Sequence, residues 1–284
     1  MNVAETMTPR SSLVTVSLPG NRDDALRFIQ EEEFSSVPVV KETENGEVYR
    51  GLVSRGDLIA NPEVEQLAIL MHEDCPTVDS AAALETVAEL VVDEDVRRVP
   101  VVDGDSLAGI VTVTDLVEGI ASGAVDGGAE VGDLARRDVN TVYAGTPLPV
   151  AERELGLAQV PYGVVLDEDC SMCGILTRVD IIDVARVVEG EDDVGDSIAD
   201  EDDDWMWEGI KAVGNRYFPT RNVELPVEPV ESFMTREVVT ISERHTTREA
   251  ARTMRNHDVE QLPLVSGDDL VGIVRDVDLV KNLV

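Results

Sequence analysis

Short apolar runs alternate along the chain with longer stretches in which apolar residues recur at helical spacing. Between residues 83 and 91 they fall three and four positions apart, which predicts an amphipathic helix with one buried face (Ala83, Leu84, Val87, Ala88 and Val91). The apolar run 99–102, a turn rich in Gly and Asp, and a second apolar run to residue 111 predict a β-hairpin. Another apolar-periodic stretch follows. With the short Thr77-Val78 step before the helix, the segment therefore predicts a β–α–β–β–α unit.

This unit occurs four times along the chain. Each copy ends its hairpin in a similar phrase that runs from a glycine to an aspartate (Gly51–Asp57, Gly109–Asp115, Gly174–Asp180 and Gly272–Asp278). A proline precedes each aspartate by 19, 15, 19 and 15 residues, and a threonine precedes each proline by 23, 23, 20 and 23 residues. Matched spacing over four copies indicates an internal repeat. Because a unit of about 55–60 residues buries too little surface alone, we expect the units to pair.

The repeats resemble cystathionine-β-synthase (CBS) domains, pairs of which form the Bateman module. The resemblance is carried by the helix–strand–strand–helix order, by apolar runs around a proline such as VPVV at 37–40 and 99–102, and by the phrase Gly-apolar-x-[Ser/Thr]-x-x-Asp. It implies an α/β (α+β) fold with four repeats, here called repeats one to four: 4–60, 68–121, 131–188 and 229–284. Repeats one and two, and repeats three and four, would form two Bateman modules in a disc-like homodimer. The chain resembles stand-alone archaeal CBS proteins of halophiles.

Repeat three departs from the pattern. It is three residues shorter in its helical part, which contains Pro147 and Pro149. Proline in a helix interior costs about 3 kcal/mol, so we expect this helix to start late or to be degraded.

In repeats one to three an aspartate stands three residues after Ser or Thr, at the junction between a strand and the next helix. This spacing can direct a carboxylate and a hydroxyl to one spot, where the helix N-terminus adds partial positive charge. Such a carboxylate can accept hydrogen bonds from both vicinal hydroxyls of a ribose, each worth roughly 1.5–3 kcal/mol. The other interpretation of each pair is an ordinary helix cap.

The resemblance implies an adenosyl ligand, either an adenine nucleotide (AMP, ADP or ATP) or S-adenosylmethionine. The residues it assigns to ribose or phosphate are Ser54, Asp57, Thr112, Asp115, Thr177 and Asp180, with Asp278 in repeat four, where Arg275 replaces the hydroxyl. Backbone around Val37, Val39, Val99 and Val101 would contact the base, with Thr15 and Thr77 near the mouth. Candidate phosphate contacts are Arg55, Arg97, Arg98 and Arg275, each of which could instead pair with a neighbouring carboxylate. Repeats one and two are the most regular, so we expect a ligand first in their cleft.

The charge of the chain bears on its partners. Of 284 residues, 58 are acidic and 23 basic, a formal net charge of −35. This balance disfavours nucleic-acid binding and docking on anionic membranes, because both depend on clustered Lys and Arg. The sequence has no apolar run long enough to span a bilayer and no signal-type N-terminus, so we expect a cytoplasmic protein. A lysine-poor acidic surface also fits adaptation to high salt, where ions screen self-repulsion; the alternative is an ordinary acidic protein.

The sequence shows no catalytic constellation. Cys170 and Cys173 form one C-x-x-C without a second pair, and the three histidines lie at no ligand spacing from it, so no metal, required cofactor or enzymatic activity is predicted. The predicted function is regulatory: the protein senses adenosyl ligands and passes a conformational change to a regulated partner protein. The alternative is a structural or interaction protein that acts as an assembly scaffold with empty sites.

Residues 189–228 form an insertion between repeats three and four. Its first part, 189–204, is a run of acidic residues and predicts a solvated linker. Its second part, Trp205–Phe218, holds four of the ten aromatic residues of the chain. An exposed aromatic cluster would be a liability, so this segment either packs within the protein or its dimer, or contacts a separate partner.

Overall fold

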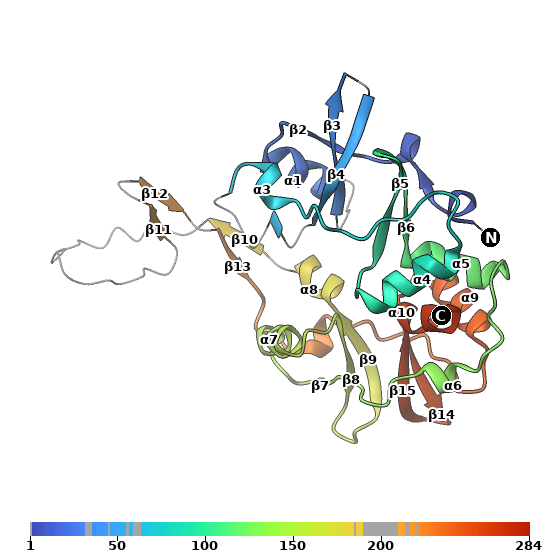
Figure 1. The fold of residues 1–284 in the computed structure, drawn as a ribbon. Helices are drawn as coiled ribbons and strands as arrows, with labels where there is room; N and C mark the ends of the chain where they lie inside the picture. Colours follow the sequence, from blue (N-terminus) through green and yellow to red (C-terminus); the bar gives the residue numbers. More distant parts are fainter. Residues whose placement is uncertain are drawn as a thin grey trace, which may run out of the picture. The chain divides into compact units, whose positions relative to one another are not determined.

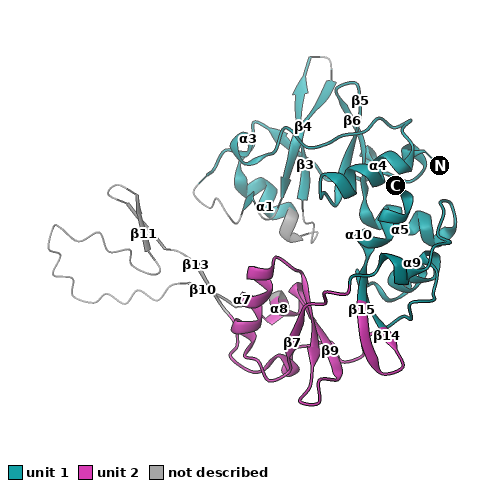
Figure 2. Ribbon diagram, turned by 60° about the horizontal axis from the view of Figure 1, so that its bottom comes forward, with its two compact units in different colours: residues 1–136, 240–264, 273–284 teal, residues 137–239, 265–272 magenta. Residues whose placement is uncertain are grey.

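The computed structural model describes residues 2–31, 36–44, 46–54, 57–58, 64–184, 186–189, 210–213, 216–219 and 221–284. Its contacts divide the chain into two compact units (Figure 2). Unit 1 holds residues 1–136, 240–264 and 273–284, and unit 2 holds residues 137–239 and 265–272. Unit 1 therefore combines most of repeats one, two and four, although they are far apart in the sequence.

Unit 1 begins with two hairpins, each accompanied by helices (Figure 1). The first part comprises η1 (Val3–Glu5), β1 (Thr8–Pro9), η2 (Arg10–Ser12), β2 (Val16–Leu18), α1 (Arg22–Glu31), β3 (Ser36–Thr43) and β4 (Gly46–Ser54). The second comprises α3 (Leu67–Leu70), α4 (Leu84–Asp93), β5 (Arg98–Asp103), β6 (Ser106–Thr112), α5 (Val113–Ser122) and α6 (Val131–Leu134). The sheets have the orders β2-β3-β4 and β1-β6-β5, with β2 parallel to β3 and each hairpin antiparallel.

The last part of the chain supplies α9 (Thr247–His257), β14 (Gln261–Ser266), β15 (Asp269–Arg275), α10 (Asp276–Val280) and η4 (Lys281–Leu283). Strands β14 and β15 pair with each other. Helix α5 packs against α9 and α10, so repeats two and four share a helical core within unit 1. Leu116 and Ile120 on α5, and Leu279 on α10, are completely buried there.

Unit 2 has the same order of elements in residues 141–184: β7 (Thr141–Tyr143), α7 (Leu148–Ala158), β8 (Tyr162–Leu166), β9 (Met172–Thr177) and α8 (Arg178–Val184). Their sheet has the order β7-β8-β9, with β7 parallel to β8. The remaining elements are β10 (Arg186–Glu189), β11 (Ile210–Val213), β12 (Arg216–Pro219), β13 (Arg221–Glu224) and η3 (Val230–Ser232). The mixed α/β fold class predicted from the repeats is confirmed.

Strand β10, at the end of repeat three, pairs with β13 of the insertion, and β11 pairs with β12 within the insertion, both antiparallel. Tyr217 and Phe218 of the predicted aromatic segment fall in β12. The rest of the predicted acidic linker and both tryptophans lie outside the described residues.

The prolines of repeat three do not degrade its helix. Helix α7 has 11 residues, with Pro147 as its N-cap and Pro149 in the first turn. In those positions a proline removes no helical hydrogen bond, because the first backbone N–H groups of a helix have no partner within it. The sequence predicted that this helix would start late or be degraded, and both expectations are wrong: α7 begins seven residues after Thr141, just as α4 begins seven residues after Thr77.

Four short segments at the starts of the repeats link the repeats in pairs. They are residues 2–9, 64–72, 130–136 and 228–235, here called lead segments. Each lead segment bridges the second hairpin strand of the other repeat in its predicted pair: Leu52 with His72, Thr8 with Ile110, Ile175 with Thr235, and Arg136 with Ile273. Outside the β1–β6 ladder each bridge consists of two reciprocal backbone hydrogen bonds of 2.8–3.1 Å. The exchange is mutual between repeats one and two and between repeats three and four.

The lead segments explain the glycine of the repeated phrase. A Cβ atom added at Gly109 would lie 2.5 Å from the backbone oxygen of Thr8 and 2.7 Å from Sδ of Met7. The Thr8 backbone cannot retreat without breaking the β1–β6 ladder. Gly51 meets the backbone of His72 in the same way, and Gly174 meets the side chain of Met234. Only glycine lets the lead segment approach this closely.

We therefore expect Gly109→Ala to destabilise the protein by about 2 kcal/mol, because a side chain inserted into a packed crossing forces the backbone apart. Urea unfolding followed by circular dichroism measures the change. Gly156→Ala is the matched control, since Gly156 lies in α7 with only the distant Glu152 carboxylate near it. This control should gain about 0.5–1 kcal/mol from helix propensity. Equal stability of the Gly109 variant and the wild type would contradict the close approach.

Candidate functional site

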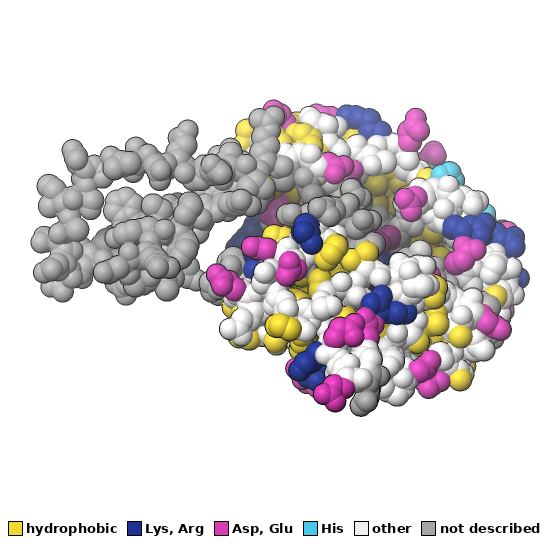
Figure 3. Space-filling model, turned by 90° about the horizontal axis from the view of Figure 1, so that it is seen from above, with side chains coloured by type: hydrophobic (Ala, Val, Ile, Leu, Met, Phe, Trp, Pro, Cys, Tyr) yellow, Lys and Arg dark blue, Asp and Glu magenta, His cyan; other side chains and the backbone are white. Residues whose placement is uncertain are grey.

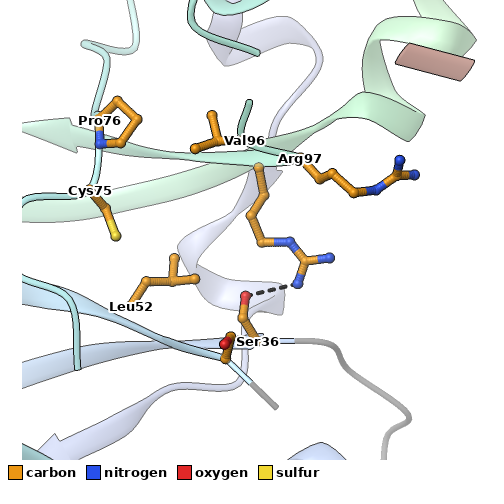
Figure 4. Close-up of a pocket in the computed structure, with 8 residues that line it drawn as sticks. Ser36, Leu52, Cys75, Pro76, Val96 and Arg97 are labelled. Atoms are coloured by element: carbon orange, nitrogen blue, oxygen red, sulfur yellow. Dashed lines mark hydrogen bonds between the residues drawn. The ribbon is translucent and has the colours of Figure 1, made fainter. Parts of the chain in front are cut away.

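A cavity of about 260 Å³ lies in unit 1 between the two hairpins of repeats one and two. Its lining comes from both repeats: Ser36, Leu52 and Ser54 from β3 and β4, Cys75 and Pro76 from the segment before Thr77, and Val96, Arg97 and Arg98 at the start of β5 (Figure 4). Leu52, Pro76 and Val96 give it an apolar wall. Ser36, Ser54 and Arg98 give it hydrogen-bond donors, while the side chain of Arg97 extends away from the other labelled lining residues (Figure 4).

Ser54 and Asp57 of repeat one meet at the edge of this cavity. The backbone N–H and the hydroxyl of Ser54 both donate to Oδ2 of Asp57, at 2.8 and 2.6 Å. Nε2 of His72, from the lead segment of repeat two, lies 2.8 Å from the other oxygen, Oδ1. Burial raises the pKa of Asp57, but the hydrogen bonds from Ser54 and His72 outweigh it and hold the pKa below its ordinary value. The carboxylate is therefore charged at neutral pH.

Thr112 and Asp115 of repeat two form a capping box at the start of α5. The Thr112 backbone N–H and hydroxyl donate to Oδ2 of Asp115 at 2.8 and 2.7 Å, and the Asp115 N–H donates back to Oγ1 at 3.3 Å. No described residue bonds to Oδ1. Burial raises the pKa of Asp115, and here the bonds from Thr112 do not outweigh it. The same phrase thus yields carboxylates with opposite pKa shifts in repeats one and two.

Thr177 and Asp180 of repeat three repeat this geometry in unit 2. The Thr177 N–H and hydroxyl donate to Oδ2 of Asp180 at 2.7 and 2.6 Å. The hydroxyl of Thr235, in the lead segment of repeat four, lies 3.4 Å from Oδ1. Thr235 thus stands where His72 stands in the first pair.

Asp278 of repeat four is not open to a ligand. Its side chain is completely buried and forms ion pairs with Arg275 at 3.1 Å and Lys281 at 2.7 Å. Burial raises the pKa of Asp278, but these bonds outweigh it and lower the pKa. The sequence offered two roles for Arg275, contact with a phosphate or an ion pair with a neighbouring carboxylate. The structure shows the second, because Arg275 pairs with Asp278.

The other candidate residues are distributed as follows. Arg98 lines the cavity and donates from Nη1 to Oγ of Ser36 at 2.8 Å (dashed line in Figure 4). Arg97 also lines the cavity and pairs with Asp276 and Glu260. Arg55 lies outside the described residues.

The predicted base-contacting valines have completely buried side chains (Val37, Val39, Val99 and Val101). Pairing of β3 with β2 begins at Val39, and Val101 bridges Val78. Thr77 is exposed beside Pro76 of the cavity. The hydroxyl of Thr15 accepts a hydrogen bond of 3.0 Å from Arg10, which is paired with Glu47.

Sequence reasoning missed five of the eight residues that line the cavity. Ser36, Leu52, Cys75, Pro76 and Val96 carry no distinctive chemistry, and His72 was treated only as a scattered histidine. The available signal was position. Ser36 and Arg98 each lie two residues before the proline of repeats one and two, and His72 and Thr235 lie five residues before Thr77 and Thr240.

Comparison with known proteins identifies the fold. The family model for the CBS domain matches residues 3–62, 64–122 and 230–284, more than half of the chain. The chain belongs to the CBS-domain family. Repeat three lies outside the matched segments of this CBS-domain protein.

Two solved structures are similar to this CBS-domain chain over the full length of both proteins. One is a conserved protein from Pyrococcus horikoshii, 28% identical with a TM-score of 0.71. The other is MJ1225 from Methanocaldococcus jannaschii, described as a proposed archaeal homologue of γ-AMPK, 20% identical with a TM-score of 0.68. The curated relative MJ1404 of the same archaeon is 24% identical over 99% of this chain. The chain spans 61% of the length of MJ1404.

The described residues lack membrane-spanning helices and metal-ligand clusters, and their acidic side chains are dispersed on one face (Figure 3). None of their helices is long and apolar enough to cross a membrane. They also contain no group of three or more His, Cys, Asp or Glu side chains arranged to hold a metal ion. On the face shown in Figure 3, acidic side chains are spread over the described surface and do not gather over one element.

The opposite pKa shifts of Asp57 and Asp115 predict opposite effects of removing each charge. A lowered pKa means that ionisation favours the folded state, so the stability from Asp57 is present above its ordinary pKa of about 3.9 and is lost as the pH falls through the folded value. A raised pKa means that ionisation opposes folding, so the stability from Asp115 is present below that ordinary pKa and is lost as the pH rises through the folded value.

At pH 7 we therefore expect Asp57→Asn to lower the free energy of unfolding, by about 1 kcal/mol, and Asp115→Asn to leave it unchanged or raise it. The measurement is urea unfolding of both variants at pH 7 and again near pH 4, where the difference between them should shrink. A larger loss for the Asp115 variant than for the Asp57 variant at pH 7 would contradict the assignment.

Proposed function

We propose that this CBS-domain protein is a regulatory protein that binds an adenosyl ligand in the cavity between repeats one and two. The observation that carries the proposal is the convergence of three kinds of group on one cavity. The Ser54–Asp57 pair offers a charged carboxylate, Arg98 offers cationic donors with Arg97 beside it, and Leu52, Pro76 and Val96 offer an apolar wall.

In this proposal Asp57 binds the ribose. Oδ2 is already satisfied by Ser54, so the vicinal hydroxyls would share Oδ1, where His72 now donates. Hydroxyl hydrogen bonds to a charged carboxylate are worth roughly 1.5–3 kcal/mol each. The arginines would contact a phosphate, and the base would pack on the apolar wall. A cavity near 260 Å³ lies just below the range of roughly 300–1,000 Å³ that is usual for small-molecule sites, which suits a ligand no larger than a nucleoside.

The ligands that we propose are AMP, ADP, ATP and S-adenosylmethionine. The protein would need no cofactor and catalyse no reaction. Binding would favour one conformer through differential affinity and so act on a regulated partner protein. The cavity residue Arg97 pairs with repeat four, which offers a physical route from the cavity to the helical core formed by α5, α9 and α10.

We also propose that residues 131–188 are a third, divergent CBS repeat that pairs with repeat four in a second Bateman module. The order β7-α7-β8-β9-α8, the Thr177–Asp180 pair and the mutual bridges of the lead segments support this. Assembly as a disc-like homodimer, a cytoplasmic location and adaptation to high salt remain proposals of the same kind, and the acidic composition supports the last.

One observation favours the second candidate function, an assembly scaffold with empty sites. The carboxylate of Asp278 is enclosed by Arg275 and Lys281, and that of Asp115 caps α5, so at least one of the four repeated sites is closed and a second has a structural role.

Thermal unfolding in about 2 M KCl with AMP, ADP, ATP or S-adenosylmethionine tests the proposal. A ligand that binds only the folded state stabilises it by about 2.7 kcal/mol at a hundredfold excess over Kd, which raises the Tm by several degrees. We expect this ligand-induced shift to disappear in Asp57→Ala and to persist in Asp180→Ala, the matched control in unit 2. No shift with any ligand would favour the scaffold.

A further inference from the structure

Arg97 belongs at once to the cavity and to an ion-pair cluster with repeat four. Its guanidinium lies against both carboxylate oxygens of Asp276, with Nη1 3.3 Å from Oδ1 and Nη2 bonded to Oδ2. Nη2 also lies 3.1 Å from a carboxylate oxygen of Glu260. Asp276 is the first residue of α10 and Glu260 immediately precedes β14, so both partners come from a repeat that contributes nothing to the cavity lining.

The carboxylates of this cluster offset the cations of the cavity. Asp276 and Glu260 face the guanidinium of Arg97, and Glu260 also acts on the nearby guanidinium of Arg98, so the four groups together carry no net charge at neutral pH. The Asp276 side chain is only 8% exposed, so solvent screens it poorly, whereas that of Glu260 is 62% exposed. Arg98 is the other cation of the lining, and it is bonded to Ser36. The phosphate end of the cavity is thus much less positive than two arginines suggest.

This loss of positive charge affects the binding of phosphates in proportion to their charge. A phosphate monoester carries roughly −1.5 to −2 at pH 7, and each further phosphate adds more negative charge close to Asp276 and Glu260. An uncharged group such as adenosine is unaffected. The carboxylates also compete with a phosphate for the same N–H donors of Arg97.

We propose that Asp276 and Glu260 determine which ligands the cavity accepts: by holding and neutralising Arg97, they select adenosyl ligands with one phosphate or none over triphosphates. The proposal rests on the adenosyl-binding function above and adds its specificity. Asp276 and Glu260 act through Arg97, so they are positioning residues that do not touch the ligand.

An alternative role for these carboxylates is to orient Arg97 for phosphate binding. The two roles predict changes of opposite sign. If the carboxylates compete with phosphate, removing one strengthens phosphate binding; if they only orient Arg97, removing one weakens it. A purely structural role changes the affinities for adenosine and AMP equally.

The test measures Kd by calorimetry for adenosine, AMP, ATP and inorganic tripolyphosphate, at the lowest KCl concentration that keeps the full chain folded. The variants are Asp276→Asn and Glu260→Gln. Because Asp276 is buried and its variant could fold poorly, the exposed Glu260 keeps the test decisive. Glu118→Gln is the matched control: it removes the Arg255–Glu118 pair of 3.0 Å, which also joins repeats two and four but lies outside the cavity lining.

We expect each cluster variant to bind AMP about three- to tenfold more tightly and ATP more tightly still, with adenosine binding and the Glu118 variant unchanged. Weaker AMP binding, or an unchanged ratio of AMP to adenosine affinity, overturns the proposal. If the wild type binds no adenosyl compound, the proposed function fails, and tripolyphosphate still decides the inference. Its affinity should rise in Glu260→Gln and fall when Arg97→Gln is added, and no rise in either cluster variant overturns it.

Discussion

The close crossing of each lead segment over the glycine of a neighbouring hairpin is the constraint on which the rest of unit 1 depends. At Gly109 the backbone of Thr8 passes so near that no side chain fits between them, and Gly51 accommodates His72 in the reciprocal position. This crossing fixes the two hairpins against each other. It brings His72 to the carboxylate of Asp57 and carries Cys75 and Pro76 on to the cavity, so the chemistry of the site follows from a packing requirement.

The repeated carboxylate illustrates how one local motif acquires different properties from its surroundings. In all four repeats the residue three positions earlier donates hydrogen bonds to one oxygen of the carboxylate, and this part of the motif is local. The second oxygen receives what the neighbouring chain provides: an imidazole at Asp57, a hydroxyl at Asp180, and a lysine at Asp278. Asp115 has no such described neighbour, and there burial dominates. The same four-residue phrase therefore produces an accessible charge in repeat one and an enclosed ion pair in repeat four.

These differences show which features of the site could be predicted from the sequence. Hairpins, helix faces and capping aspartates depend on residues close together in the chain, and their spacing predicted the fold class and the Ser54–Asp57 and Thr112–Asp115 pairs. Arg97 and its partner Asp276 are separated by 179 positions in the sequence. No periodicity predicts which carboxylate an arginine will bind over such a distance. The closure of Asp278 was missed for a related reason. Arg275 was compared with the hydroxyl that it replaces, whereas the flexible side chain turns back onto its own helix and Lys281 joins it.

The discontinuous make-up of unit 1 has a consequence for its biosynthesis. Domains tend to fold from the N-terminus as the chain emerges from the ribosome, but unit 1 needs residues 240–264 and 273–284 to cover α5. Residues 137–239 must be translated before those residues emerge. During that time α9 and α10 do not yet cover the apolar face of α5, which includes Leu116 and Ile120. Pairings so distant in sequence form slowly and leave apolar surface uncovered meanwhile. The nascent chain of this protein is thus a natural client for chaperones that shield such surfaces.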